Sequence, residues 1–190
     1  MTDLLHSDEV KELVRDAYRG IDSVSGEIAA SIYSPEELAE VPQSVVDRAL
    51  GVANHLRYAA LSPDEVVLDI GCGAGIDSIL AARRIGPTGR VVALDFLPEM
   101  LERTDAAAAE ADVGNVDTLE GEMELIPLPN DSVDVVVSNG VLNLSPRKAR
   151  ALAECARVLR AGGRFCVSDL TVVEEELPPE VLTHPAAWAG

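Results

Sequence analysis

A short glycine-rich stretch carries the clearest chemical signal in the sequence. Its residues are Asp69, Gly71, Cys72, Gly73 and Gly75. Glycines let a backbone approach a ligand closely and adopt positive φ angles. An apolar run at residues 66–70 precedes the stretch and a helical pattern follows it. The loop therefore predicts a ligand site at a helix N-terminus, where the partial charge is positive.

A second acidic residue, Asp95, ends the next apolar run, at residues 90–95. A carboxylate at the end of this strand can accept hydrogen bonds from both hydroxyls of a ribose, which suits NAD and also S-adenosylmethionine. The glycine spacing favours the second ligand, because Ser78 stands where the NAD fingerprint has its third glycine. Asp69 favours it too, since a carboxylate repels a pyrophosphate and suits a ligand with an ammonium and a sulfonium.

Strand and helix patterns alternate around these residues. Apolar runs predict buried strands at 66–70, 90–95, 116–119, 132–138 and 164–172. Helical spacing occurs between them at 76–85, 98–112 and 145–159, with Ser145 as the cap and Gly162–Gly163 as the end of the last helix. The alternation predicts an α/β fold with a doubly wound, mostly parallel, Rossmann-like sheet. Ligands bind beyond the carboxyl ends of such strands. The residues this places along one rim are Gly71–Gly75, Asp95, Phe96, Glu122, Met123, Asn139 and Gly140.

The first 60 residues read as a helical segment in front of this domain. Helical patterns cover residues 8–19 and 44–58, and Ser34 followed by Pro35 marks a helix start between them. We therefore predict an N-terminal helical segment over residues 1–60 and a Rossmann-like domain over residues 61–190. Residues 177–188 contain enough apolar side chains to form a short helix that covers the fifth strand.

Composition narrows the range of partners. The chain has 190 residues, with 33 acidic and 15 basic side chains and a net charge of −18. Such a surface repels nucleic acids and anionic membranes. Cys72, Cys155 and Cys166 form no metal-binding pair, so no metal site is predicted. A charged N-terminus and the lack of a long apolar run favour the cytoplasm, where free thiols stay reduced.

Several segments together resemble a known family. The motifs VLDIGCGAG, VVALD, GEMELIPLPNDSVDVVVSN and RVLRAGGRF are similar to those of class I S-adenosylmethionine-dependent methyltransferases, over about residues 60–172. A narrower resemblance, to bacterial arsenite methyltransferases, is carried by GIDSILAARRIGPTGRVVALDFLPEML, SNGVLNLSPRKARALAECARVLRAGGRFCVSDL and PAAWAG. The resemblance implies S-adenosyl-L-methionine as methyl donor and a small molecule as methyl acceptor.

The resemblance also implies roles for the rim residues. Gly71, Cys72 and Gly73 would line the methionine part of the cofactor, with Asp69 near its ammonium group. Asp95 would hold the ribose hydroxyls, and Phe96 would pack against the adenine. Glu122 or the Met123 amide would meet the adenine edge, although Met123 fits a core position equally well. Asn139 and Gly140 would border the methyl and amino-acid side.

The sequence departs from the arsenite methyltransferase pattern at two positions. The resemblance implies arsenic-binding cysteines where this chain has Val52 and Gly140. Trivalent arsenic is a soft ion that needs soft ligands. We therefore expect that the chain does not methylate arsenite, and a quinone-like acceptor stays open, because the LPLPNDSVDVV segment is shared with quinone-like C-methyltransferases.

Two further functions stay open beside methyl transfer. The family's sheet usually continues for two strands after the fifth, so the chain could be a cofactor-binding subunit that is inactive without a partner. Either a second copy or a partner chain would then complete the sheet, because open apolar edges attract pairing. An NAD-linked oxidoreductase is disfavoured by the glycine spacing. No catalytic residue is predicted, since a sulfonium already activates its methyl group.

Overall fold

The structure is a computed structural model that describes residue 12, residues 14–16 and residues 26–171. Within these residues the chain forms a five-stranded sheet in the order β3-β2-β1-β4-β5. The strands are β1 (Val66–Ile70), β2 (Arg90–Asp95), β3 (Val116–Glu120), β4 (Val133–Asn139) and β5 (Leu159–Ser168). Every pairing between these strands is parallel. The predicted doubly wound α/β sheet is therefore confirmed.

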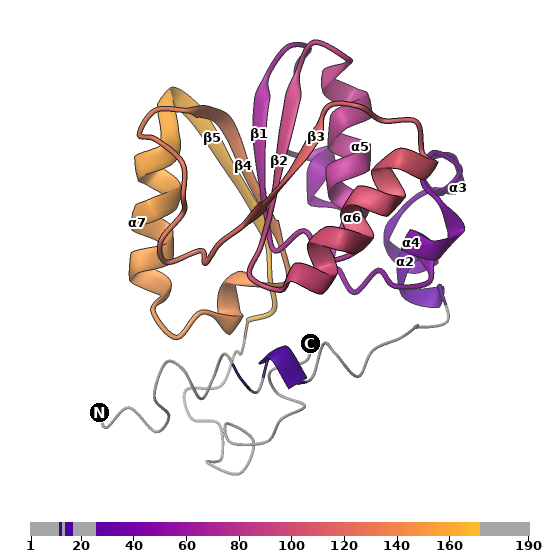
Figure 1. The fold of residues 1–190 in the computed structure, drawn as a ribbon, viewed down its shortest axis with the longest axis horizontal. Helices are drawn as coiled ribbons and strands as arrows, with labels where there is room; N and C mark the ends of the chain where they lie inside the picture. Colours follow the sequence, from indigo (N-terminus) through magenta and orange to yellow (C-terminus); the bar gives the residue numbers. More distant parts are fainter. Residues whose placement is uncertain (1–11, 13, 17–25, 172–190) are drawn as a thin grey trace.

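Helices cover both faces of the sheet (Figure 1). They are α5 (Ile76–Ile85), α6 (Pro98–Glu110) and α7 (Lys148–Val158). Helices α5 and α6 pack on one face, and α7 packs on the other face, at the β5 side. Among the described residues, every helix is too short or too polar to span a bilayer.

Alternate side chains of the central strands feed two separate cores. Val67, Val91 and Val135 point to one face, where they pack with Ile79 and Leu80 of α5. Their neighbours Leu68, Val92 and Val136 point to the other face and pack with Cys155 and Val158 of α7. Burial on both faces explains why these strands read as continuous apolar runs.

The N-terminal segment packs on the α5 side of the sheet (Figure 1). It contains α2 (Glu27–Ile32), α3 (Pro35–Leu38), α4 (Gln43–Val46) and the 3₁₀ turn η1 (His55–Arg57). Ser34 caps α3 as predicted, in a capping box with Glu37. The predicted helix over 44–58 is wrong. Helix α4 ends at Val46, and the backbone N–H groups of Val52 and Ala53 bond to a side chain on β4 instead of to a helical turn.

Two boundaries near the last helix also differ from the prediction. The helix begins at Lys148, and Ser145 is extended with its hydroxyl bonded to the carboxylate of Glu124. The helix ends at Val158, because Leu159 already pairs with Val133 of β4. Gly162–Gly163 therefore lies within β5, beside a register shift. The predicted helix at 177–188 and most of the one at 8–19 lie outside the described residues.

Candidate functional site

Two adjoining cavities open at the carboxyl ends of the strands. The first, of about 720 Å³, is lined by the predicted residues Gly71, Gly73, Asp95, Phe96, Glu122 and Met123. The second, of about 670 Å³, is lined by the predicted residues Asp69, Gly71, Cys72, Gly73 and Asn139. Each volume includes open solvent and falls in the range of small-molecule sites. Gly71 and Gly73 line both cavities, at the point where the strand order reverses between β1 and β4.

The three glycines of the loop have different surroundings. Gly71 has φ +71°, and a Cβ there would lie 2.6 Å from Cγ2 of Val141. A Cβ at Gly75 would lie 3.0 Å from Oγ1 of Thr104 on α6. Gly73 has φ +54° and no atom within 4 Å of its Cβ position. The outer glycines therefore allow close packing, whereas Gly73 faces open space that a ligand can fill.

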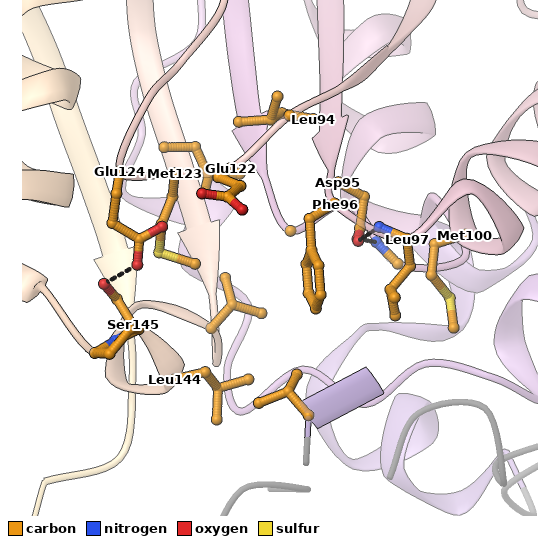
Figure 2. A pocket seen from close by; sticks show the side chains of 17 residues that line it. Leu94, Asp95, Phe96, Leu97, Met100, Glu122, Met123, Glu124, Leu144 and Ser145 are labelled. Atoms are coloured by element: carbon orange, nitrogen blue, oxygen red, sulfur yellow. Dashed lines mark hydrogen bonds between the residues drawn. The ribbon is translucent and has the colours of Figure 1, made fainter. Parts of the chain in front are cut away.

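Asp95 fastens the end of β2 to this loop. Its carboxylate is 8% exposed and accepts hydrogen bonds from the Gly73 N–H at 3.1 Å and the Leu97 N–H at 3.0 Å. Burial raises the pKa of Asp95, and these backbone hydrogen bonds act in the opposite direction. Figure 2 shows this side chain at the wall of the first cavity. Its remaining lone pairs are available to hydroxyl donors.

Apolar side chains form most of the first cavity around Asp95. The Phe96 ring stands between the Glu122 side and the Leu97 side of the space, and Leu144 lies below it (Figure 2). The guanidinium carbon of Arg15 lies 6.0 Å from the centroid of the Phe96 ring. The cavity therefore suits a flat, apolar ring system with a polar rim.

The turn after β3 supplies the other wall of the first cavity. Met123 lines the cavity and also packs against the core on the α7 face, so both predicted roles fit its position. Glu122 is exposed at the cavity, whereas Glu124 is buried and bonded to the Ser145 hydroxyl (Figure 2).

A buried acidic pair lies beside the second cavity. Asp69 is 2% exposed and accepts a 2.6 Å hydrogen bond from the Ser78 hydroxyl. Burial raises the pKa of Asp69 from 3.8 to about 7, and the neighbouring Asp77 carboxylate adds to this rise. A cation placed beside this pair would lower the pKa of Asp69 and bind favourably.

The Cys72 thiol packs away from solvent. It is 7% exposed, and its sulfur lies 3.6 Å from Oγ1 of Thr104. Burial, then the Asp95 and Asp69 carboxylates, raise the pKa of Cys72 well above 9.0. The thiol therefore stays protonated at neutral pH and does not act as a nucleophile.

Asn139 at the end of β4 binds protein groups on every side. Its Nδ2 donates to Oδ2 of Asp77 and to the Ala53 carbonyl, both at 2.9 Å. Its Oδ1 accepts from the Val52 N–H at 2.9 Å and the Ser168 hydroxyl at 2.7 Å. Tyr33 completes the cluster with a 2.8 Å bond to Asp77 Oδ1, and together these contacts hold the N-terminal segment against the strand ends.

Val52 and Gly140 lie next to each other beside this cluster. A Cβ at Gly140 would lie 3.3 Å from Cγ1 of Val52. Gly140 has φ +75°, and neither it nor Gly75 lines the two cavities. The two positions singled out by the sequence for their lack of cysteine are therefore spatial neighbours.

Sequence reasoning missed several lining residues. They include Val14, Arg48, Leu94, Leu97, Met100, Arg103, Glu124, Val141, Leu144, Ser145 and Pro146. Most of them lie within a few positions of a predicted rim residue, whereas Val14 and Arg48 come from the N-terminal segment. The helical phase of α6 places Met100 and Arg103 one turn apart, and this was the one local pattern that could have indicated them.

Known proteins are similar to this chain in sequence and in fold. An arsenite methyltransferase from Halobacterium salinarum is 34% identical over 207 residues, which cover 96% of this chain and 52% of that protein. A demethylmenaquinone methyltransferase from Listeria monocytogenes is 38% identical over 103 residues, which cover 54% of this chain and 44% of that protein. This chain therefore spans about half the length of these relatives.

A solved structure agrees with this relationship. The crystal structure of an arsenic(III) S-adenosylmethionine methyltransferase from Chlamydomonas reinhardtii superimposes with a TM-score of 0.71 at 36% identity, covering 80% of this chain and 53% of that chain. Residues 61–189 match the methyltransferase domain family, which is more than half of the sequence. The resemblance drawn from the motifs is thus confirmed, and the chain belongs to the family of S-adenosylmethionine-dependent methyltransferase domains.

Proposed function

We propose that this chain transfers a methyl group from S-adenosylmethionine to a small-molecule acceptor. The observation that carries the proposal is the shared wall of the two cavities, because Gly71 and Gly73 line both of them. Buried Asp95 lies on one side of these glycines and buried Asp69 on the other. A ligand with a nucleoside at one end and an amino acid at the other would lie across the glycines.

In this proposal each cavity binds a different part of the cofactor. In the first, Asp95 accepts hydrogen bonds from the ribose hydroxyls, while Phe96 and Met123 contact the adenine and Glu122 lies at its edge. In the second, Asp69 lies near the ammonium group. Cys72 contributes backbone only, since its thiol is turned to Thr104.

The protein's contribution to the reaction is alignment. Bound S-adenosylmethionine supplies a methyl group that its positively charged sulfur already activates. The chain has to hold donor and acceptor in line, and such positioning can lower a barrier by several kcal/mol, about 7–11 at most. Asn139 fixes residues 52 and 53 over the strand ends, which keeps this wall of the site rigid. We assign no general base, because a base is needed only for an acceptor that must lose a proton.

Calorimetric titration with S-adenosylhomocysteine tests the cofactor assignment. Asp95→Ala removes an acceptor for two hydroxyls, and each hydrogen bond to a charged group contributes about 1.5–3 kcal/mol. The two bonds together contribute at least about 3 kcal/mol, so we expect at least about a hundredfold loss of affinity. The matched control is Asp117→Ala, which removes an exposed carboxylate on β3 and should bind as the wild type does. Tight binding of NAD without binding of S-adenosylhomocysteine would overturn the proposal.

The methyl acceptor that fits the site best is a molecule other than arsenite, one that needs no thiol ligands. Val52 and Gly140 place no thiol at their shared position, the Cys72 thiol packs against Thr104, and Cys155 and Cys166 lie on α7 and β5. We expect no methylation of arsenite above background by purified protein, measured by mass spectrometry of methylated arsenic products. Detection of methylarsenite would contradict this and would require another arsenic ligand. A carbon acceptor of the quinone class fits the similarity to demethylmenaquinone methyltransferases.

A second candidate function is a cofactor-binding subunit that needs a partner chain. The outer edge of β5 pairs with no strand among residues 26–171, and apolar side chains on this flank are exposed: Leu152, Phe165, Val167 and Leu170. Such an edge attracts pairing with another chain or with a further segment. Light scattering after gel filtration, combined with a methylation assay, separates the two candidates. A monomer that turns over an acceptor would exclude the subunit role.

We also propose a cytoplasmic location. All three cysteines are unpaired, although Cys72 and Cys155 are buried and Cys166 is half-buried. Unpaired thiols are typical of a reducing compartment.

A further inference from the structure

The connection between β3 and β4 forms one wall of the first cavity, although the structure describes no helix or strand within it. It runs along α7 (Figure 1), and its first part, residues 121–124, lines the cavity. Glu122 and Met123, the residues assigned to the adenine, lie in this part (Figure 2). Backbone outside regular elements must find its hydrogen bonds elsewhere. The groups that supply these bonds therefore decide where Glu122 and Met123 lie.

Three polar side chains on one side of α7 bind this turn. They are Arg150, Glu154 and Arg157, and their spacing of four and three positions places them on the same side of the helix. Arg150 Nε donates to the Glu124 carbonyl at 2.9 Å. Oε2 of Glu154 accepts from the Ile126 N–H at 3.0 Å. In the described part of the chain none of the three lines either cavity, so they act on a ligand through the turn.

Arg157 makes the most extensive contact with the turn. Its Nη2 donates to the Ile126 carbonyl and its Nη1 to the Leu128 carbonyl, both at 2.8 Å. Nη1 also donates to Oδ1 of Asn130 at 3.0 Å. Glu154 orients the guanidinium by accepting from Nη2 at 2.7 Å and from Nε at 2.9 Å. These bonds from Arg157 lower the pKa of Glu154 below 4.5, so both side chains are charged at neutral pH.

The contact of Arg157 reaches the cavity wall through Pro127. This proline lies between the two carbonyls that Arg157 binds. A Cβ at Gly121 would lie 2.7 Å from Cδ of Pro127, so the proline ring packs directly on the Gly121 backbone. Gly121 lines the first cavity and precedes Glu122, whose carbonyl accepts from the Leu125 N–H at 3.0 Å and closes the turn. A displacement of Pro127 therefore moves the cavity wall.

We propose that Arg157 and Glu154 are positioning residues for the adenine end of the cofactor. They fix the carbonyls on both sides of Pro127, and this keeps Glu122 and the Met123 amide where the adenine edge meets them. A guanidinium suits this task, because its planar set of donors binds two carbonyls at once in fixed directions. The inference rests on the proposed function. It adds the residues outside the cavity on which recognition of the base depends.

Three ligands separate recognition of the base from binding by the rest of the site. S-adenosylhomocysteine has both the adenine and the amino acid. 5′-Methylthioadenosine shares its adenine, ribose and thioether and lacks the amino acid. S-inosylhomocysteine keeps the amino acid, but its base has an oxygen in place of the adenine amino group. We expect the wild type to bind S-inosylhomocysteine at least about tenfold more weakly than S-adenosylhomocysteine, because the acceptor that faces the amino group is left unpaired.

Arg157→Gln should remove most of this preference for adenine. It should weaken S-adenosylhomocysteine and 5′-methylthioadenosine alike, by about tenfold, and S-inosylhomocysteine by less than about threefold. Glu154→Gln keeps an acceptor for the Ile126 N–H and loses the charge that orients Arg157, so its effect on the first two ligands should be about threefold. Arg157→Lys keeps the charge without the planar donors and should recover part of the preference.

The matched control is Arg160→Gln. Arg160 lies three positions beyond Arg157, pairs with Asp134 and lines neither cavity in the described residues, so this variant should bind all three ligands as the wild type does. Thermal unfolding of each variant shows whether the fold is retained, and Glu154→Gln carries the test if Arg157→Gln does not fold.

Hydrogen exchange provides a measurement without any ligand. Amides in residues 122–128 should exchange at least about tenfold faster in Arg157→Gln than in the wild type, because the turn opens more often once its contacts with α7 are lost. Amides in β2, which makes none of these contacts, should exchange at an unchanged rate.

The other outcomes each overturn the inference. Equal weakening of all three ligands in folded Arg157→Gln would make the pair with Glu154 a purely structural contact. Unchanged affinities, or unchanged exchange in residues 122–128, would show that the turn keeps its shape without Arg157. A wild type that binds S-adenosylhomocysteine and S-inosylhomocysteine equally well would overturn the inference and leave the proposed function standing. A wild type that binds none of the three ligands would overturn both.

Discussion

The two cavities that meet at the glycine loop differ in what their walls offer a ligand. The first is mostly apolar, with the Phe96 ring at its centre and two buried carboxylates, Asp95 and Glu124, of which Glu124 is bonded to the Ser145 hydroxyl. The second holds two carboxylates and two guanidinium groups. Apolar contact depends weakly on pH, whereas binding by charge depends strongly on it. We therefore expect the nucleoside end of a ligand to be recognised by shape and the amino-acid end by charge.

The largest effects are expected at the glycines that both cavities share. Gly71→Ala should destabilise the fold most, because the left-handed backbone adds about 1–2 kcal/mol. The clash of the new Cβ with Val141 adds about 1–3 kcal/mol more. Gly73→Ala carries only the first of these penalties, since nothing lies within 4 Å of its Cβ position. Urea unfolding of the two variants measures this difference.

The loss of ligand affinity should be large in Gly73→Ala relative to its small loss of stability, whereas Gly71→Ala should mainly lose stability. The Gly73→Ala methyl group enters the open space assigned to the cofactor, so both S-adenosylhomocysteine and 5′-methylthioadenosine should bind at least about tenfold more weakly. A Gly73→Ala protein with full affinity would show that the ligand does not lie across this glycine. Equal stability of the two variants would contradict the packing role of Gly71.

A smaller effect, confined to the second cavity, should come from the titration of Asp69. Its pKa is raised from 3.8 to about 7, so the carboxyl is largely protonated below pH 7. An ammonium group binds the ionised form, and the affinity for S-adenosylhomocysteine should therefore rise with pH, by up to about tenfold per pH unit, and level off above about pH 7. The affinity for 5′-methylthioadenosine should stay nearly constant, because this ligand has no ammonium group.

The same pKa predicts how stability depends on pH. The stability that the proton on Asp69 confers is fully present below pH 3.8 and is lost as the pH rises through about 7. Asp69→Asn keeps an acceptor for Ser78 without the buried charge, so it should raise the melting temperature more at pH 8 than at pH 5.5. It should also flatten the pH dependence of binding. Equal pH profiles for the two ligands would contradict the division between the cavities.

The centre of the fold could be predicted from sequence because its signals are local. The strands next to Asp69 and Asp95 are continuous apolar runs, and their predicted limits agree with β1 and β2. The glycine loop follows from its spacing between a strand and a helix. Placing Asp95 beside Gly73 required only the rule that parallel strands end at one edge of the sheet.

The N-terminal wall of the site could not be predicted in the same way. The helical pattern at 44–58 continues through Val52, yet α4 ends at Val46 and the Val52 N–H donates to Asn139, 87 positions away. The prediction for Ser145 failed for a similar reason, since its hydroxyl bonds to Glu124 instead of capping a helix. Arg48 has no local feature that marks it as facing a cavity. The local sequence pattern therefore does not indicate the role of residues whose contacts are distant in sequence.

The smallest effect is expected at the outer side of the first cavity, where Arg15 lies over Phe96. A cation above an aromatic ring at this distance contributes about 0.5–1 kcal/mol at a partly exposed site. Under the proposal that the adenine stacks on the Phe96 ring, Arg15→Ala should weaken S-adenosylhomocysteine and 5′-methylthioadenosine equally, by about two- to fivefold. Arg15→Lys keeps a cation over the ring and should lose less. A loss limited to S-adenosylhomocysteine would move Arg15 to the amino-acid end of the ligand. Tighter binding of both ligands would show that Arg15 occupies the ring face that the adenine needs.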